Sequence, residues 1–165
     1  MAEDRRKPAL SARYGWTPVG VAILLLWLTV GGARAELPTQ ELRVADQTLT
    51  VEIAATPQAM ARGLMHREHM PEAHGMLFIW PGDQVVAMWM KNTLIPLSVA
   101  FIDRDFRILN IADMEPRSLR THPSQGPARY ALEVNQGWFD RHGVEAGTRI
   151  DDLERLVTDL AGGRH

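Results

Sequence analysis

The chain has 165 residues, 18 basic and 20 acidic side chains, a formal charge of −2 and no cysteine. This length corresponds to about one domain, and the 45% hydrophobic and 23% charged content is ordinary for a folded globular protein. The lack of cysteine excludes disulfides, thiolate nucleophiles, iron–sulfur clusters and cysteine-ligated zinc. The near-neutral charge argues against a nucleic-acid partner, because neutralising many phosphates requires a surplus of basic groups.

The first 35 residues have the three-part form of a secretory signal peptide. Basic residues precede an uncharged apolar run at 19–30, and Ala33-Arg34-Ala35 has small residues at the two positions that a signal peptidase reads. The apolar run has 12 residues, whereas a membrane-spanning helix needs about 20. We therefore predict cleavage after Ala35 and a periplasmic or secreted location in the bacterial envelope. The alternative is an uncleaved N-terminal anchor.

Removal of this leader would make the chain more acidic. Residues 1–35 contain five basic and two acidic groups, so residues 36–165 would carry a net charge of −5. This charge disfavours binding to nucleic acid or to an anionic membrane surface. We expect contact with a membrane only through an uncleaved leader.

Eight segments predict β-strands, because apolar and polar side chains alternate in them or because they form short apolar runs between turns. They are residues 42–44, 49–53, 76–80, 85–90, 97–101, 107–112, 130–134 and 144–150. Many short strands with turns every 8 to 12 residues are typical of a β-sandwich or barrel. The sequence thus predicts a mainly β, compact fold with loops at 66–75 and 115–127.

Three helices are predicted beside these strands. Thr56-Pro57 favours a helix start, since threonine caps well and proline suits the first helical position, so a short helix should cover 57–62. A second short helix is predicted at 138–142. Residues 151–161 are amphipathic and follow a capping-box-like start. We therefore divide the chain into a leader, a single β domain at 36–150, and a C-terminal helix and tail at 151–165.

Lys91 is the only lysine among residues 36–165, beside 12 arginines. It interrupts two apolar segments, where a cation must reach solvent, pair with a carboxylate or face a ligand. A turn whose lysine extends into water is the alternative. We predict a polar recess for a small ligand or an envelope protein. The residues predicted to bind are Arg62, Lys91, Asn92, Thr93, Glu115, Arg129 and Glu133.

Two other functions remain open at this point. A hydrolase or lyase would use Lys91 or His122 as its base, although the sequence shows no nucleophile motif beside either residue. A periplasmic copper protein would use clustered imidazoles and thioethers. These are His66, His69, His74, Met65, Met70 and Met76. We assign no catalytic set, no metal ligands and no cofactor from the sequence.

Several segments, in order and spacing, resemble the family called domain of unknown function 192. The segments are Thr56-Pro57, Ala61–Met65, Gly75–Phe78, Trp89–Leu97, Ala100–Asp103, Met114–Pro116, Ala128–Glu133 and Gly137–Phe139. The resemblance covers about residues 38–150. It implies a compact, mostly β domain that is exported or lipid-anchored in bacteria and has no established activity.

The chain departs from the family pattern in one loop. Many relatives have two cysteines after the segment that corresponds to Glu115-Pro116, where this chain has Arg117 and the stretch 120–122 instead. The resemblance therefore carries no thiol chemistry to this protein.

Overall fold

The computed structural model describes residues 36–163. The predicted signal peptide at 1–35 and the last two residues of the predicted tail lie outside the described residues. Within the described range, none of the helices is both long and apolar enough to cross a membrane.

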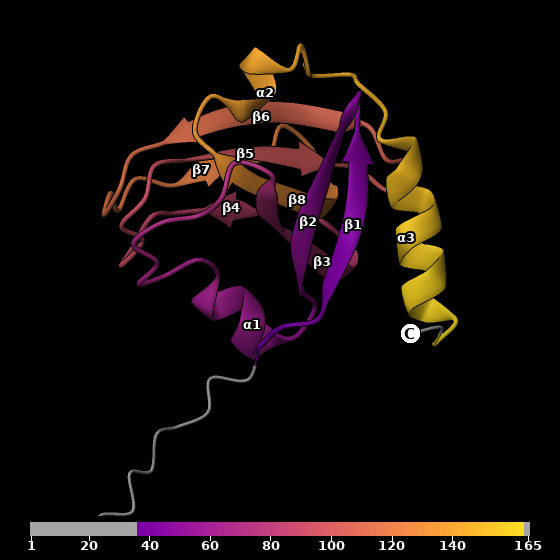
Figure 1. Cartoon of the computed structure of the whole chain (residues 1–165), viewed down its shortest axis with the longest axis horizontal. Helices are drawn as coiled ribbons and strands as arrows, with labels where there is room; N and C mark the ends of the chain where they lie inside the picture. The colour runs from indigo at the N-terminus through magenta and orange to yellow at the C-terminus, as the bar shows by residue number, and fades with distance from the viewer. Residues whose placement is uncertain (1–35, 164–165) are drawn as a thin grey trace, which may run out of the picture. The chain divides into compact units, whose positions relative to one another are not determined.

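A six-stranded sheet forms the centre of the domain (Figure 1). In spatial order its strands are β1 (Thr39–Val44), β2 (Gln47–Ala54), β3 (His74–Gln84), β8 (Ala128–Asn135), β5 (Leu97–Ile102) and β6 (Ile108–Met114). Strands β2 and β3 are parallel, and the other neighbouring strands are antiparallel. The sheet is open, with β1 and β6 at its edges. The predicted mainly β fold is confirmed, and of the two predicted architectures this open sheet fits the sandwich-like one.

Short elements complete the domain. They are α1 (Pro57–Arg62), β4 (Ala87–Met88), β7 (His122–Pro123), α2 (Trp138–Arg141) and α3 (Asp151–Ala161). Strands β4 and β7 pair in a separate two-stranded sheet. Helix α1 connects the parallel strands β2 and β3, which require such a crossover connection.

The predicted start and end of α1 are confirmed by its caps. The side-chain oxygen of Thr56 accepts a hydrogen bond from the backbone N–H of Ala59 at 3.2 Å. Gly63 follows the helix with φ of 48°, which glycine adopts readily, and donates to the Ala59 carbonyl at 2.8 Å. These local bonds hold α1 in the position where its last residues reach the candidate site.

The six-stranded sheet buries side chains on both of its faces. Strand β8 shows this alternation: Tyr130, Leu132 and Val134 belong to one hydrophobic core, whereas Ala131 belongs to another. The first core also contains residues of α2 and α3, and the second contains residues of α1 and of the 86–95 region. The sheet therefore separates two cores, and the candidate site lies on the side of the second.

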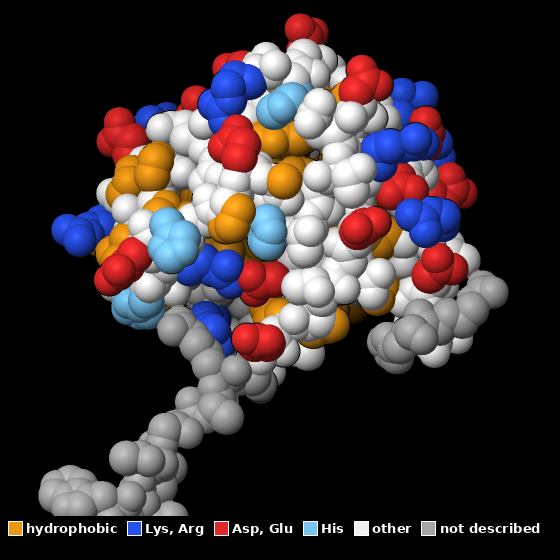
Figure 2. Space-filling view, in the orientation of Figure 1, with side chains coloured by type: hydrophobic (Ala, Val, Ile, Leu, Met, Phe, Trp, Pro, Cys, Tyr) orange, Lys and Arg blue, Asp and Glu red, His pale blue; other side chains and the backbone are white. Residues whose placement is uncertain are grey.

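The predicted amphipathic C-terminal helix is confirmed as α3, and it packs on the β domain. Its residues Leu153 and Leu156 are buried in the first core. The backbone N–H of Arg43 on β1 donates to Asp152 at 2.9 Å, and Figure 1 shows α3 beside β1. The exposed face of the domain in this orientation mixes acidic and basic side chains (Figure 2).

Two of the predicted strands differ in the structure. The apolar run at 85–90 contributes only the two residues of β4, because Val86 and Met90 are buried in the second core while Met90 N–H bonds to Ser118 outside any sheet. The prediction of a strand at 144–150 is wrong: the described structure has only an isolated bridge there, at Arg149. An apolar pattern indicates burial, but strand pairing depends on a partner that the pattern does not specify.

Candidate functional site

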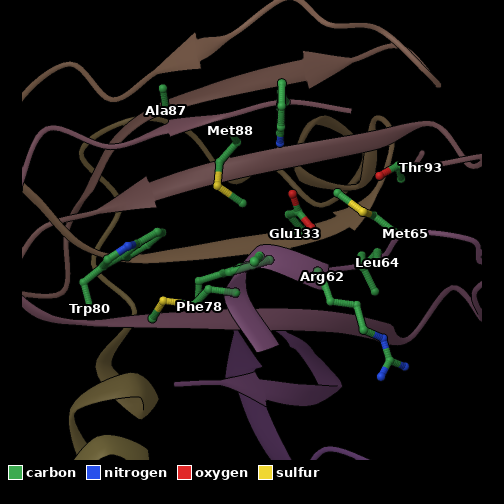
Figure 3. Close-up of a pocket in the computed structure, with 13 residues that line it drawn as sticks. Arg62, Leu64, Met65, Phe78, Trp80, Ala87, Met88, Thr93 and Glu133 are labelled. Carbon is green, nitrogen blue, oxygen red and sulfur yellow. The ribbon is translucent and has the colours of Figure 1, made fainter. Parts of the chain in front are cut away.

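A cavity of about 250 Å³ opens on the side of the second core (Figure 3). We call it the Glu133 cavity. Its apolar lining includes Phe78, Trp80, Trp89, Met60, Met65 and Met88. Its polar lining includes Arg62, Thr93 and Glu133. The cavity thus draws on α1, β3, β4 and β8 and on the segment that follows β4.

Glu133 lies in the middle of the sheet, where β8 is paired on both sides. Its cross-strand neighbours are Met76 on β3 and Val99 on β5, both buried in the second core. The Glu133 residue is only 4% exposed, and its side chain makes no hydrogen bond or ion pair within residues 36–163. Burial without a cationic partner raises the pKa of Glu133 to about 8.

The Glu133 side chain points into the cavity. Figure 3 shows its carboxyl group between the side chains of Met88 and Met65, with Phe78 below it. A carboxyl group so placed can accept hydrogen bonds when ionised or donate one when protonated. It is the one carboxyl group of the lining, beside the polar side chains of Arg62 and Thr93.

Arg62 also lines the cavity but leaves Glu133 unpaired. It ends α1 and is exposed, and Figure 3 shows its guanidinium directed away from Glu133. Among the described ion pairs none includes Arg62. The lining therefore contains a guanidinium and a carboxyl group that form no ion pair with each other.

The structure brings three of the seven predicted binding residues to one cavity. Arg62, Thr93 and Glu133 line it, whereas Lys91, Asn92, Glu115 and Arg129 are not among its lining residues. Ligand binding by any of the seven stays a prediction, and the geometry favours Arg62, Thr93 and Glu133.

Lys91 sits in an exposed turn next to the cavity. Asn92 has φ of 57°, a left-handed conformation that asparagine tolerates better than most residues. The turn is held by a hydrogen bond from Thr93 N–H to the Met90 carbonyl at 3.0 Å. The Lys91 ammonium nitrogen lies 5.3 Å from the centroid of the Trp89 ring, which lines the cavity. The turn thus exposes Lys91 and buries Thr93, two residues further on.

Glu115 and Arg129 lie away from the lining for different reasons. Glu115 is exposed in the loop after β6. Arg129 shares a face of β8 with Glu133, but four residues of strand separate them by roughly 13 Å. Its guanidinium pairs with Asp83 at 3.4 Å instead.

The three histidines of the copper hypothesis do not gather into one cluster. Within residues 36–163, no three His, Cys, Asp or Glu side chains come close enough to hold an ion together. His66 and His69 are exposed, while Met70 and Met76 are part of the second core. The proposed copper ligands are therefore dispersed between the surface and the interior.

His122, a base in the enzyme hypothesis, lies in the two-stranded sheet opposite Met88. Burial, and to a lesser extent the nearby charge of Arg120, lowers the pKa of His122. Neither His122 nor Lys91 lines the Glu133 cavity. The enzyme hypothesis stays untested, with its two bases outside this lining.

Sequence reasoning did not assign the aromatic and methionine walls of the cavity to a binding recess, although it named Met65 as a candidate copper ligand. Phe78 and Trp80 lie two residues apart on β3, and their rings stack with centroids 6.1 Å apart. One signal was present in the sequence: Glu133 is the only charged side chain within the strand predicted at 130–134. A charged residue inside an apolar strand is expected to be buried, and a buried charge requires a partner or a functional reason.

Comparisons with known proteins agree with the motif resemblance. The model of the DUF192 family, which is described as Uncharacterized ACR, matches residues 40–151, and this confirms the family predicted from the motifs. No curated protein matches the chain.

Two solved structures are similar to the chain. One is a protein from Sinorhizobium meliloti 1021 that its description suggests to be a transcription regulator, with 38% identity and a TM-score of 0.65, covering 69% of this chain and 93% of that one. The other is a protein of unknown function from Novosphingobium aromaticivorans DSM 12444, with 31% identity and a TM-score of 0.63, covering 69% and 83%.

Proposed function

The chain belongs to the DUF192 family, and from that premise we propose that it is an exported binding module that holds a small molecule in the Glu133 cavity. The observation that carries the proposal is the cavity itself, a concave, mostly apolar site with one buried and unpartnered carboxyl group. Binding sites for small molecules commonly have this make-up. A volume of about 250 Å³ is just below the roughly 300–1,000 Å³ of sites for drug-sized ligands, which supports a smaller ligand.

The charge of this chain argues against proposing for it the role in transcription that is suggested for the Sinorhizobium protein. The chain has a formal charge of −2, and Figure 2 shows both signs interspersed on the face in view. Strong binding to DNA requires several basic groups that neutralise phosphates. A small ligand in an internal cavity requires no such surface.

The binding proposal is tested by blocking the cavity. Ala87 is exposed and lines the Glu133 cavity. Ala87→Trp would therefore add a bulky side chain at the cavity without replacing any buried residue. The matched control is Ala146→Trp, the same change at an exposed alanine outside the lining.

Each purified chain would be incubated with a small-molecule extract of bacterial cells, passed through a gel-filtration column and extracted for mass spectrometry. We expect a compound that is retained by the unmodified chain and by Ala146→Trp but not by Ala87→Trp. Retention by all three chains, or by none, would overturn the proposal.

Export is tested separately with the full chain. We expect the protein in the osmotic-shock fraction of a bacterial host, with Glu36 as its first residue after removal of the leader. A protein that remains in the cytoplasm with Met1 or Ala2 at its start would contradict export and leave the binding proposal intact.

A further inference from the structure

We propose that the ligand of the Glu133 cavity is a protonated primary amine with an apolar body. The carboxylate of Glu133 would accept hydrogen bonds from the ammonium group, and the aromatic and methionine walls would contact the apolar body. This inference rests on the proposed function, and the experiment below separates the failure of one from the failure of the other.

The first argument is the carboxyl group that faces the cavity without a protein partner. Glu133 is 4% exposed, points into the cavity (Figure 3) and has no hydrogen-bond or ion-pair partner within residues 36–163. A buried ionisable group without a partner is costly, and a ligand that supplies the opposite charge removes much of that cost. An ammonium group carries three N–H donors for a carboxylate. The ligand would thus provide the partner that the described chain does not.

The second argument is the set of rings that face the same space. Phe78, Trp80 and Trp89 all line the cavity. Aromatic faces attract cations within about 6 Å of the ring centroid, and tryptophan does so best. The chain contains such a contact at this site, because the ammonium nitrogen of Lys91 lies 5.3 Å from the Trp89 centroid. The Trp89 ring therefore already contacts one alkylammonium group, that of Lys91 outside the lining, and the rings of Phe78 and Trp80 are the ones left for a ligand.

The third argument is the apolar wall. Met60, Met65 and Met88 line the cavity, and methionine adapts its shape to irregular apolar ligands. A hydrated metal dication would lose its water here without gaining enough oxygen ligands, because Glu133 is the single carboxylate of the lining. An inorganic anion would meet Glu133 with the wrong charge. An amine with an apolar body satisfies both the carboxyl group and the wall.

The experiment uses 2-phenylethylamine as the probe and 2-phenylethanol as its uncharged isostere. Isothermal titration calorimetry at pH 8 with the full chain, as isolated from the host, measures both affinities. The variants are Glu133→Gln, which keeps the shape and removes the charge, and Glu145→Gln, the same change at an exposed glutamate outside the lining.

We expect the amine to bind at least tenfold more tightly than the alcohol, Glu133→Gln to abolish this preference, and Glu145→Gln to leave it unchanged. Equal affinity for the two probes would overturn the ammonium assignment while the cavity remained a binding site. If Ala87→Trp retains every probe that the unmodified chain retains, the proposed function itself fails.

A second measurement requires no variant and therefore does not depend on the folding of Glu133→Gln. Burial raises the pKa of Glu133 to about 8, so below pH 8 an ammonium ligand must displace a proton from the carboxyl group. Affinity for 2-phenylethylamine should therefore fall about fivefold from pH 8 to 7 and about tenfold from pH 7 to 6, while the amine itself stays protonated. Affinity for 2-phenylethanol should change little. An amine affinity that is constant with pH would overturn the assignment of Glu133 as the acceptor.

The same titration distinguishes simple amines from amino acids. Arg62 lines the cavity with its guanidinium directed away from Glu133, so the carboxylate of phenylalanine would reach it only if the Arg62 side chain turned toward the cavity. If phenylalanine binds more tightly than 2-phenylethylamine and Arg62→Gln removes the difference, the ligand is of the amino-acid type. Equal or weaker binding of phenylalanine assigns the site to simple amines. A chain that binds neither compound contradicts the ammonium proposal.

Discussion

Glu133 on β8 lies directly opposite Met76 on β3, so the cross-strand partner of a buried carboxyl group is a thioether. Val99 occupies the opposite position on the other neighbouring strand, β5. Neither neighbour donates a hydrogen bond or carries a charge. The environment of Glu133 therefore stabilises its protonated form, and this has a measurable consequence for the stability of the whole domain.

The free energy of unfolding should decrease as the pH rises from about 4.5 to 8. The pKa of Glu133 is raised from 4.5 to about 8 in the folded chain, so in this window the folded state holds a proton that the unfolded state has released. The loss amounts to about 1.4 kcal/mol for each pH unit as an upper estimate. Urea unfolding of Glu133→Gln at pH 5, 6, 7 and 8 should show a shallower pH dependence. Parallel pH profiles for the two chains would contradict a raised pKa for Glu133.

Gly75 permits the close approach of β3 and β8 beside the site. A Cβ atom at this position would lie 2.6 Å from the backbone oxygen of Glu133 and 3.2 Å from a side-chain carbon of Val134. We expect Gly75→Ala to destabilise the domain by about 1–3 kcal/mol, because the strands must separate. Gly82→Ala is the control, since no heavy atom lies within 4 Å of its Cβ position. Equal urea midpoints for the two variants would refute this account.

The cap of α1 should affect both stability and binding. Thr56→Ala removes the acceptor for Ala59 N–H and should cost about 1 kcal/mol. Fraying of α1 would also displace Met60 and Arg62, which line the Glu133 cavity, so binding of 2-phenylethylamine should weaken. Thr56→Ser retains the hydroxyl and should behave as the unmodified chain in thermal unfolding and calorimetry. A Thr56→Ala chain with unchanged affinity would show that the lining does not depend on this cap.

Lys91 should influence ligand binding only through its charge. Its ammonium lies near a lining ring but not in the lining, so it repels a cationic ligand weakly. Lys91→Gln should raise the affinity for 2-phenylethylamine about twofold at low ionic strength, and 0.5 M salt should reduce the difference. A marked loss of affinity would instead support the direct binding role that the sequence suggested for Lys91.

Much of the local structure could be predicted from the sequence. The hairpin around Asp46-Gln47, the helix over 57–62 and the strand around 130–134 are confirmed. Each depends on a pattern within a few neighbouring residues: alternation with a period of two, or a cap next to a proline. Such patterns can be recognised without knowing where the segment lies in the fold. The hydrogen bonds of a helix cap are local, and the alternation of a strand repeats along one element.

The cavity depended on the tertiary structure. Residues Arg62, Thr93 and Glu133 meet there although they are separated by tens of positions along the chain. Periodicity shows that Glu133 shares a face of its strand with Ala131, but not which helix and loop cover that face. The burial of Thr93 and the exposure of Lys91, two residues apart, likewise result from a turn held by contacts with other parts of the chain. The sequence alone determined the locally patterned elements, such as the helix over 57–62 and the strand around 130–134. Packing decided whether the segments at 85–90 and 144–150 pair as strands, and which carboxyl group lies inside without a partner.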